Sequence, residues 1–274
     1  MMQEIGAATR RRVALRVFAA GWVALAAPLA AQTLLLEPVA DATVYEESPE
    51  FANGSGDFLF SGRIVGGPRR RLLLRFDIGG ALPPGATVTG ATLTLTVDRT
   101  ISGSVAMPLH RVLSAWGEGV SDAGSPGGQG TAAAAGDATW MWRSFPTQAW
   151  TTPGGDFGIV PSAVTTVAGE AAYSWNGAGM VADLQSWLDA PASNHGWMLL
   201  ADEDVPGPTA KRFVAREHAS ASERPLLLVE YAIGTDPQPQ PSAAPVTVPG
   251  LRIGVLGALA TLFALFAGTA LRRR

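Results

Sequence analysis

Short runs in which apolar and polar residues alternate recur along most of the chain. The clearest is 91–97, where Leu93, Leu95 and Val97 alternate with threonines. A side-chain period of two is that of a β-strand with one face on a core and the other toward water, where β-branched threonine is favoured. Apolar or alternating runs predict further strands at 72–78, 105–112, 196–200, 212–217 and 225–231. Glycine and proline turns separate these runs, so the pattern predicts an all-β sandwich.

Two segments break this alternation. In 179–189 the apolar residues recur at helical spacing on one face, at Met180, Val181, Leu184 and Leu188. This spacing predicts a helix. Residues 117–136 are rich in Gly, Ala and Ser and poor in large apolar residues, which predicts a long loop.

The first 31 residues have the order of a secretory signal peptide. Arginines at 10–12 and 16 precede an apolar segment, 17–29, and the small residues Ala30 and Ala31 follow. Cleavage after either alanine fits this order. The alternative is an uncleaved membrane anchor, for which the apolar run is short. The folded domain is expected from residue 32 onward.

The last 25 residues, 250–274, predict a transmembrane helix. Their uncharged run 253–271, at about 1.5 Å of rise per residue, comes close to the roughly 30 Å of a bilayer's hydrocarbon core. The terminal arginines, 272–274, favour the cytoplasmic side. A proline-rich segment, 234–249, is typical of a stiff linker. The domain 32–233 is therefore expected to be exported, and either anchored in a bacterial inner membrane or processed to the cell surface.

Charge is unevenly distributed along the chain. The region 32–249 carries 12 basic and 22 acidic residues, a net charge of −10. Such a domain is expected to repel nucleic acid, because affinity there comes largely from Lys and Arg that neutralise phosphates. The chain contains no cysteine, which excludes disulfides and thiolate chemistry.

The order of several short motifs adds a family resemblance. They include ADATVY at 40–45, NGSG at 53–56, RRLLLRFD at 70–77, VLSAW at 112–116, GDATW at 136–140, NHGW at 194–197 and FVARE at 213–217. Over about 37–232 the chain resembles the DNRLRE domain family, although Ala215 stands where that family usually has serine. The resemblance implies a jelly-roll β-sandwich of secreted and surface proteins, related to carbohydrate-binding module family 96 and not in itself catalytic.

The tail also resembles a known kind of signal. Val248-Pro249, one apolar span and a terminal arginine cluster are similar to C-terminal sorting signals of Gram-negative bacteria. Gly250-Leu251 departs from the usual forms of that motif. The resemblance implies a sorting protease as a partner that acts on the tail.

Two arginines within predicted strands, Arg75 and Arg216, are candidate ligand-binding residues. A guanidinium on a sheet can donate paired hydrogen bonds to carboxylate or hydroxyl groups of a sugar. The alternative is that both pair with nearby carboxylates and hold strands together, which arginines in buried strands usually require.

Tryptophans supply a second candidate feature. Trp140 and Trp142 are two residues apart and would share one face of a strand, where their rings could stack on sugar rings. Tryptophans also fill sandwich cores. We expect Trp187 and Trp197 in the core and leave both alternatives open for Trp140 and Trp142.

A third candidate is a calcium site. Asp41, Asn53 and Asp57 offer hard oxygen ligands around a glycine-rich turn, and such ligands suit calcium. The alternative is an ordinary turn in which Asn53-Gly54 adopts positive φ.

The sequence thus predicts an exported, membrane-tethered module that binds a polysaccharide or cell-surface glycan without catalysis. One alternative is a structural or adhesive surface protein without a small ligand. A less favoured one is a polysaccharide lyase or hydrolase, because the three histidines are scattered and no nucleophile motif is present.

Overall fold

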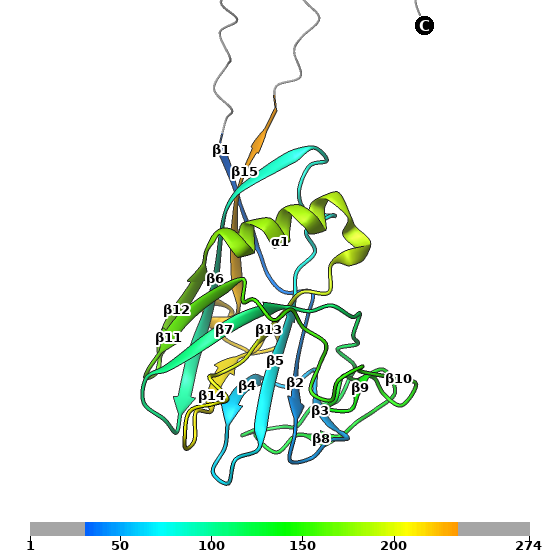
Figure 1. The fold of residues 1–274 in the computed structure, drawn as a ribbon, viewed down its shortest axis with the longest axis vertical. Helices are drawn as coiled ribbons and strands as arrows, with labels where there is room; N and C mark the ends of the chain where they lie inside the picture. Colours follow the sequence, from blue (N-terminus) through cyan, green and yellow to red (C-terminus); the bar gives the residue numbers. More distant parts are fainter. Residues whose placement is uncertain (1–30, 235–274) are drawn as a thin grey trace, which may run out of the picture. The chain divides into compact units, whose positions relative to one another are not determined.

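The computed structural model describes residues 31–234, and Figure 1 shows their arrangement. The predicted linker beyond residue 234, the membrane tail and all of the signal segment except Ala31 lie outside these residues. Within the described part of the chain, no helix is long and apolar enough to cross a membrane.

The described residues form mainly antiparallel β-strands, which confirms the all-β class. The strands are β1 Ala31–Leu36, β2 Ala40–Tyr45, β3 Phe51–Asn53, β4 Phe58–Arg63, β5 Arg69–Arg75, β6 Ala86–Thr100, β7 Val105–Arg111, β8 Thr131–Ala132, β9 Trp142–Ser144, β10 Gln148–Ala149, β11 Ala163–Val167, β12 Ala171–Asn176, β13 Trp197–Leu199, β14 Lys211–Val214 and β15 Leu226–Ile233. The helices are α1 Ala178–Asp189, close to the predicted 179–189, and the 3₁₀ turns η1 Pro191–Ser193 and η2 Ala221–Glu223.

Hydrogen bonds link the main strands in the order β1-β15-β6-β14-β4-β5-β13-β7-β11, with β12 beside β6 and β2 beside β5. Strand β4 connects the two layers of the sandwich, because it pairs with β14 up to Ser61 and with β5 from Gly62. Gly62 has φ of +114°, and a Cβ there would lie 2.7 Å from backbone atoms of Thr209. Only glycine therefore fits this corner.

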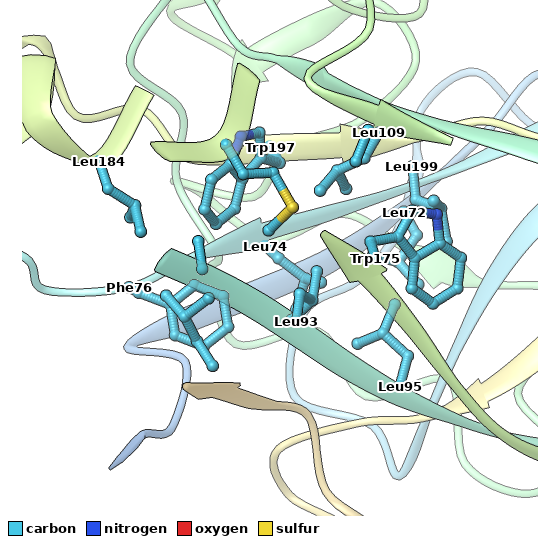
Figure 2. Packing of buried hydrophobic residues seen from close by; sticks show 14 of the residues in the cluster. Leu72, Leu74, Phe76, Leu93, Leu95, Leu109, Trp175, Leu184, Trp197 and Leu199 are labelled. Atoms are coloured by element: carbon cyan, nitrogen blue, oxygen red, sulfur yellow. The ribbon is translucent and has the colours of Figure 1, made fainter. Parts of the chain in front are cut away.

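The main core lies between the two layers, and Figure 2 shows part of it. Leu93 and Leu95 of β6 are fully buried, whereas Thr92, Thr94 and Thr96 on the other face are partly exposed, so the predicted facing of this strand is confirmed. Trp187 of α1 packs against Trp197 of β13 with ring centroids 4.7 Å apart. Both tryptophans are therefore core residues, as predicted.

A second apolar cluster covers the other face of β2, β5 and β13. Leu73 of β5 belongs to this cluster, whereas Leu72 and Leu74 belong to the main core. The covering residues come from the irregular segment 112–157 and include Val112, Trp116, Ala138, Trp140 and Trp150. Strand β5 is consequently buried on both faces, which makes it the centre of the domain.

Some sequence predictions were wrong in extent. The predicted strand 212–217 ends at Val214, because the next two N–H groups bond to the carbonyl of Asp57 and the carboxylate of Asp41 instead of a neighbouring strand. The predicted loop 117–136 contains β8. Strand β1 begins at Ala31, which pairs with Ala232 of β15.

Lys211, at the start of β14, has only 1% of its surface exposed. Its ammonium, with three N–H donors, lies within hydrogen-bonding distance of four oxygens, at 2.8 Å from Thr100 Oγ1, 3.0 Å from Ser102 O, 2.7 Å from Gly103 O and 2.6 Å from Ala168 O. These bonds tie the β6–β7 and β11–β12 turns to β14 and compensate for the buried charge.

The packing of β6 gives a stability prediction. We expect Leu95→Ala to lower the free energy of unfolding by about 2–5 kcal/mol, because Leu95 is fully buried and its removal leaves a cavity. Thr94→Ala on the opposite face of the same strand is the control and should stay within about 0.5 kcal/mol of wild type. Equal small effects of the two substitutions in urea unfolding would contradict the assigned facing.

Candidate ligand-binding site

Several arginines of β5 lie beneath residues 112–157, which we call the covering segment. Because side chains alternate along a strand, Arg69, Arg71 and Arg75 share one face with Leu73. The guanidinium carbons of Arg69 and Arg71 lie 5.3 and 4.9 Å from the ring centroid of Trp140. Arg75 lies 5.5 Å from the ring of Trp116. These are cation–π distances.

Trp140 is enclosed by this arrangement. Arg71 donates to Glu203 at 2.8 and 2.7 Å and to the carbonyl of Gly154 at 2.9 Å, while Arg69 pairs with Glu46 at 2.6 Å. Trp140 is only 5% exposed, so it belongs to the core and offers no open ring face. The tryptophan–arginine contacts stabilise the covering segment rather than present a stacking platform.

Trp142 is placed differently from Trp140. It begins β9 and is half-buried, with its ring edge-on to Phe145 at 6.2 Å between centroids. Trp140 precedes the strand, so the two rings do not form the shared strand face that their spacing predicted. Of the two, Trp142 is the more accessible to a ligand.

Arg216 is held by carboxylates. Its Nε lies 2.7 Å from Glu118 and 2.8 Å from Glu217, and its backbone N–H donates to Asp41 at 2.9 Å. Glu118 also accepts the N–H of Asp41. This carboxylate cluster ties β2, the covering segment and the chain after β14 together. Arg216 therefore fits the alternative prediction, in which it pairs with nearby carboxylates and holds strands together.

The carboxylate cluster contains an excess of negative charge. Burial, followed by the charge of Glu217, raises the pKa of Asp41 well above its usual value. Burial and Glu118 likewise raise the pKa of Glu217. One oxygen of Asp41 and one of Glu217 are buried without a hydrogen-bond partner. Protonation of one carboxylate in this cluster would therefore remove one negative charge and supply a hydrogen-bond donor.

The three residues proposed for calcium have separate roles in the described structure. The amide of Asn53 donates to the carbonyl of Phe58 at 2.7 Å and accepts the N–H of Ala123 at 3.0 Å. Asp57 is exposed, and Asp41 belongs to the carboxylate cluster. In residues 31–234, no three His, Cys, Asp or Glu side chains are grouped to hold a metal ion.

The turn at Asn53-Gly54 also differs in detail from the alternative prediction. Gly54 is not among the glycines with positive φ. A Cβ at Gly54 would instead lie 1.9 Å from the carbonyl oxygen of Glu118. Glycine is required here because the covering segment passes very close to this backbone.

Arg75 and Arg143 are the arginines of this region whose guanidiniums are not held by a carboxylate of the described residues. Within the described residues neither forms an ion pair; Arg143 donates to the carbonyl of Ala115 at 2.9 Å. The indole N–H of Trp116 donates to the carbonyl of His195 at 2.8 Å. Burial, and then the charges of Arg75, Arg111 and Arg143, lower the pKa of His195, so its ring is neutral at pH 7. We call Arg75, Arg111, Arg143 and His195 the basic cluster.

A shallow groove of about 480 Å³ follows the same stretch of chain. Its lining combines apolar and hydroxyl side chains and comprises Leu113, Ser114, Thr151, Thr152, Gly155, Asp156, Phe157 and Ile159. Leu113 and Ser114 line the groove, and the next two residues, Ala115 and Trp116, contact the basic cluster. No sequence pattern predicts this groove, because its two walls are about 40 residues apart and irregular in structure.

Asp156 holds the groove in shape. Its carboxylate accepts the N–H groups of Thr151 and Thr152 at 3.1 and 2.9 Å and the hydroxyl of Ser114 at 3.0 Å. Burial alone would raise the pKa of Asp156, but these hydrogen bonds together hold it below its usual value. The groove therefore contains a carboxylate that hydrogen bonds from Ser114, Thr151 and Thr152 hold in place.

Comparisons with protein families and curated proteins found no relative of this chain. No protein family model matches the chain, and no curated protein matches it significantly.

The raised pKa of Asp41 predicts a pH-dependent difference in stability. Because that pKa is higher in the folded protein than in the unfolded chain, the folded state binds more protons between the two values. The contribution of Asp41 to stability is then complete below the unfolded pKa and is lost as pH rises through the folded pKa. Asp41→Asn removes this loss and keeps an oxygen for the N–H of Arg216.

We therefore expect Asp41→Asn to be more stable than wild type at pH 7. That advantage should shrink toward about pH 4, by up to about 1.4 kcal/mol per pH unit. Urea unfolding at several pH values measures it, and Asp57→Asn, at an exposed carboxylate, is the control. A wild type that is the more stable protein at pH 7 would show that Asp41 is needed as an anion.

Proposed function

We propose that residues 32–233 form an exported, non-catalytic carbohydrate-binding module of the jelly-roll type, held at a bacterial membrane or cell surface. The observation that supports this most is the open groove lined by residues between Leu113 and Ile159, together with the guanidiniums of Arg143 and Arg75, which contact the next residues along its wall, Ala115 and Trp116. Open grooves with a few hydroxyl groups and guanidinium donors suit an extended polyhydroxylated chain better than an enclosed small molecule.

Each part of this region has a chemical role toward a sugar. Arg75 and Arg143 donate hydrogen bonds to hydroxyl groups, since their guanidiniums have no carboxylate partner among the described residues. Leu113 and Ile159, which are 57% and 93% exposed, contact the apolar face of a pyranose ring. Trp142 extends the contact surface by aromatic stacking. Arg216 and Trp140 support the fold and do not bind the ligand directly.

Net charge limits the choice of glycan. The domain and linker together carry −10, which disfavours a uniformly anionic polymer unless calcium or another cation bridges the two. We therefore favour a neutral or sparsely charged polysaccharide.

A second candidate is a structural or adhesive surface protein. The specific observation in its favour is the burial of Trp140 against two ion-paired arginines, Arg69 and Arg71. An aromatic residue placed in this way strengthens the sandwich without presenting a ligand surface.

Topology is the first test of this proposal. Protease added to spheroplasts should digest the domain 32–233, because the signal-like start and the arginine-terminated tail predict that it lies outside the inner membrane. The mass of the mature protein then reports whether the signal and the tail have been cut. Full protection in spheroplasts, with digestion only after lysis, would contradict export.

Glycan binding is the second test. Arrays of neutral and uronic-acid oligosaccharides, with and without calcium, are screened with the purified protein, followed by isothermal titration of each hit. We expect Arg75→Ala and Arg143→Ala each to weaken binding by roughly 10- to 100-fold, the effect of losing a charged hydrogen bond of about 1.5–3 kcal/mol. Trp142→Ala should also weaken binding.

The control for this titration is Arg99→Ala, which removes an exposed arginine of β6 outside the groove. It should bind as wild type does. Absence of heat with every glycan would favour the structural alternative, and release of new reducing ends would favour an enzyme.

A further inference from the structure

The three asparagines of this chain occupy very different environments. Two of them, Asn53 and Asn176, are followed by glycine, and Asn194 is followed by His195. An asparagine followed by glycine is open to attack on its side-chain amide by the next backbone nitrogen, because glycine has no Cβ to obstruct the approach. The structure decides which of the two sequences can react.

Asn53 is protected in the folded protein. It is 1% exposed, both atoms of its amide are hydrogen-bonded, and the N–H of Gly54 donates to the carbonyl of Ser121 at 2.9 Å. The amide of Asn194 is also held, by the carbonyl of Phe76 at 2.7 Å and the N–H of Gly196 at 3.2 Å. Reaction at either position requires local opening of the fold.

Asn176 has none of these restraints. It is the last residue of β12, which pairs with β6 alone, and both Asn176 and Gly177 are exposed. Among the described residues, neither the side chain of Asn176 nor the N–H of Gly177 takes part in a hydrogen bond. The two residues also line a surface hollow of about 430 Å³, which admits water.

Helix α1 adds an electrostatic contribution at this position. Gly177 is its N-cap residue and provides no side-chain cap, and the first turn contains no acidic residue. The positive end of the helix dipole is thus uncompensated, and it favours negative charge that forms nearby. Both the deprotonated backbone nitrogen and a product carboxylate carry such charge.

We propose that Asn176–Gly177 is a site of spontaneous deamidation in the folded protein. The deprotonated nitrogen of Gly177 attacks Cγ of Asn176, the Cγ–Nδ2 bond breaks, and ammonia leaves with a proton from water. Water then opens the resulting cyclic imide at one of its two carbonyls. The products are aspartate and isoaspartate at position 176, and no oxidant or metal takes part.

The two products differ in their effect on the fold. Aspartate places a carboxylate at the N-terminus of α1, which is favourable. Isoaspartate adds a carbon atom to the main chain at the end of β12, where Asn176 is paired with Thr92. This shifts the register between the strand and the helix that follows.

Peptide mass mapping of the purified chain, aged at mildly alkaline pH, tests the proposal. In native buffer, conversion at Asn176 should be at least about tenfold faster than at Asn53, a ratio that corresponds to about 1.4 kcal/mol of local opening. In concentrated urea the two rates should become similar, because both sites then have the same Asn-Gly sequence without protection.

Substitutions complete the test. Asn176→Gln should abolish the acidic charge variant that accumulates with age, whereas Asn53→Gln should not change its rate of appearance; Asn176→Asp should co-migrate with it. Native conversion at Asn53 that equals or exceeds conversion at Asn176 would overturn the proposal. So would an Asn176 that stays intact in native buffer while it reacts in urea.

Discussion

Burial of β5 on both faces is the constraint on which the rest of this domain depends. A strand in a two-layer sandwich normally exposes one face, but here both faces of β5 are covered, and the outer one carries three arginines. Charged side chains tolerate such burial only when they are paired and hydrogen-bonded. Glu46 and Glu203 supply those partners for Arg69 and Arg71, and the indole of Trp140 lies against both guanidiniums. Segment 112–157 completes this enclosure, because it supplies the Trp140 ring and the carbonyl of Gly154 that accepts a hydrogen bond from Arg71.

The regular elements could be predicted from the sequence because their signals are local. The alternation of β6 and the helical spacing of α1 record which side of each element faces the core. The partners of charged residues could not be predicted in this way. Arg71 and Glu203 are 132 positions apart, and Arg216 and Glu118 are 98 positions apart. No sequence periodicity relates such pairs. The sequence therefore could not predict that Arg71 is enclosed and ion-paired, whereas Arg75 has no carboxylate partner among the described residues.

The same reasoning applies to the tryptophans. Their number indicates a large aromatic content but not its location, since a ring that stacks on a sugar and a ring that stacks on an arginine occur in similar sequences. In this domain the enclosed rings strengthen the second layer and the groove depends mainly on hydroxyl and aliphatic side chains. A ligand would therefore be held more by hydrogen bonds than by aromatic stacking, which favours discrimination between hydroxyl patterns over general attraction to sugar rings.

Lys211 has a practical consequence for handling the protein. It is the only lysine of the chain, and its ammonium is buried among four oxygen acceptors. The chain also lacks cysteine. Reagents directed at primary amines therefore reach only the α-amino group of the folded protein, wherever processing has left it. A dye, a biotin or a sensor surface coupled through amines would attach at that single point, so the labelled protein would be chemically uniform and its groove would stay unmodified.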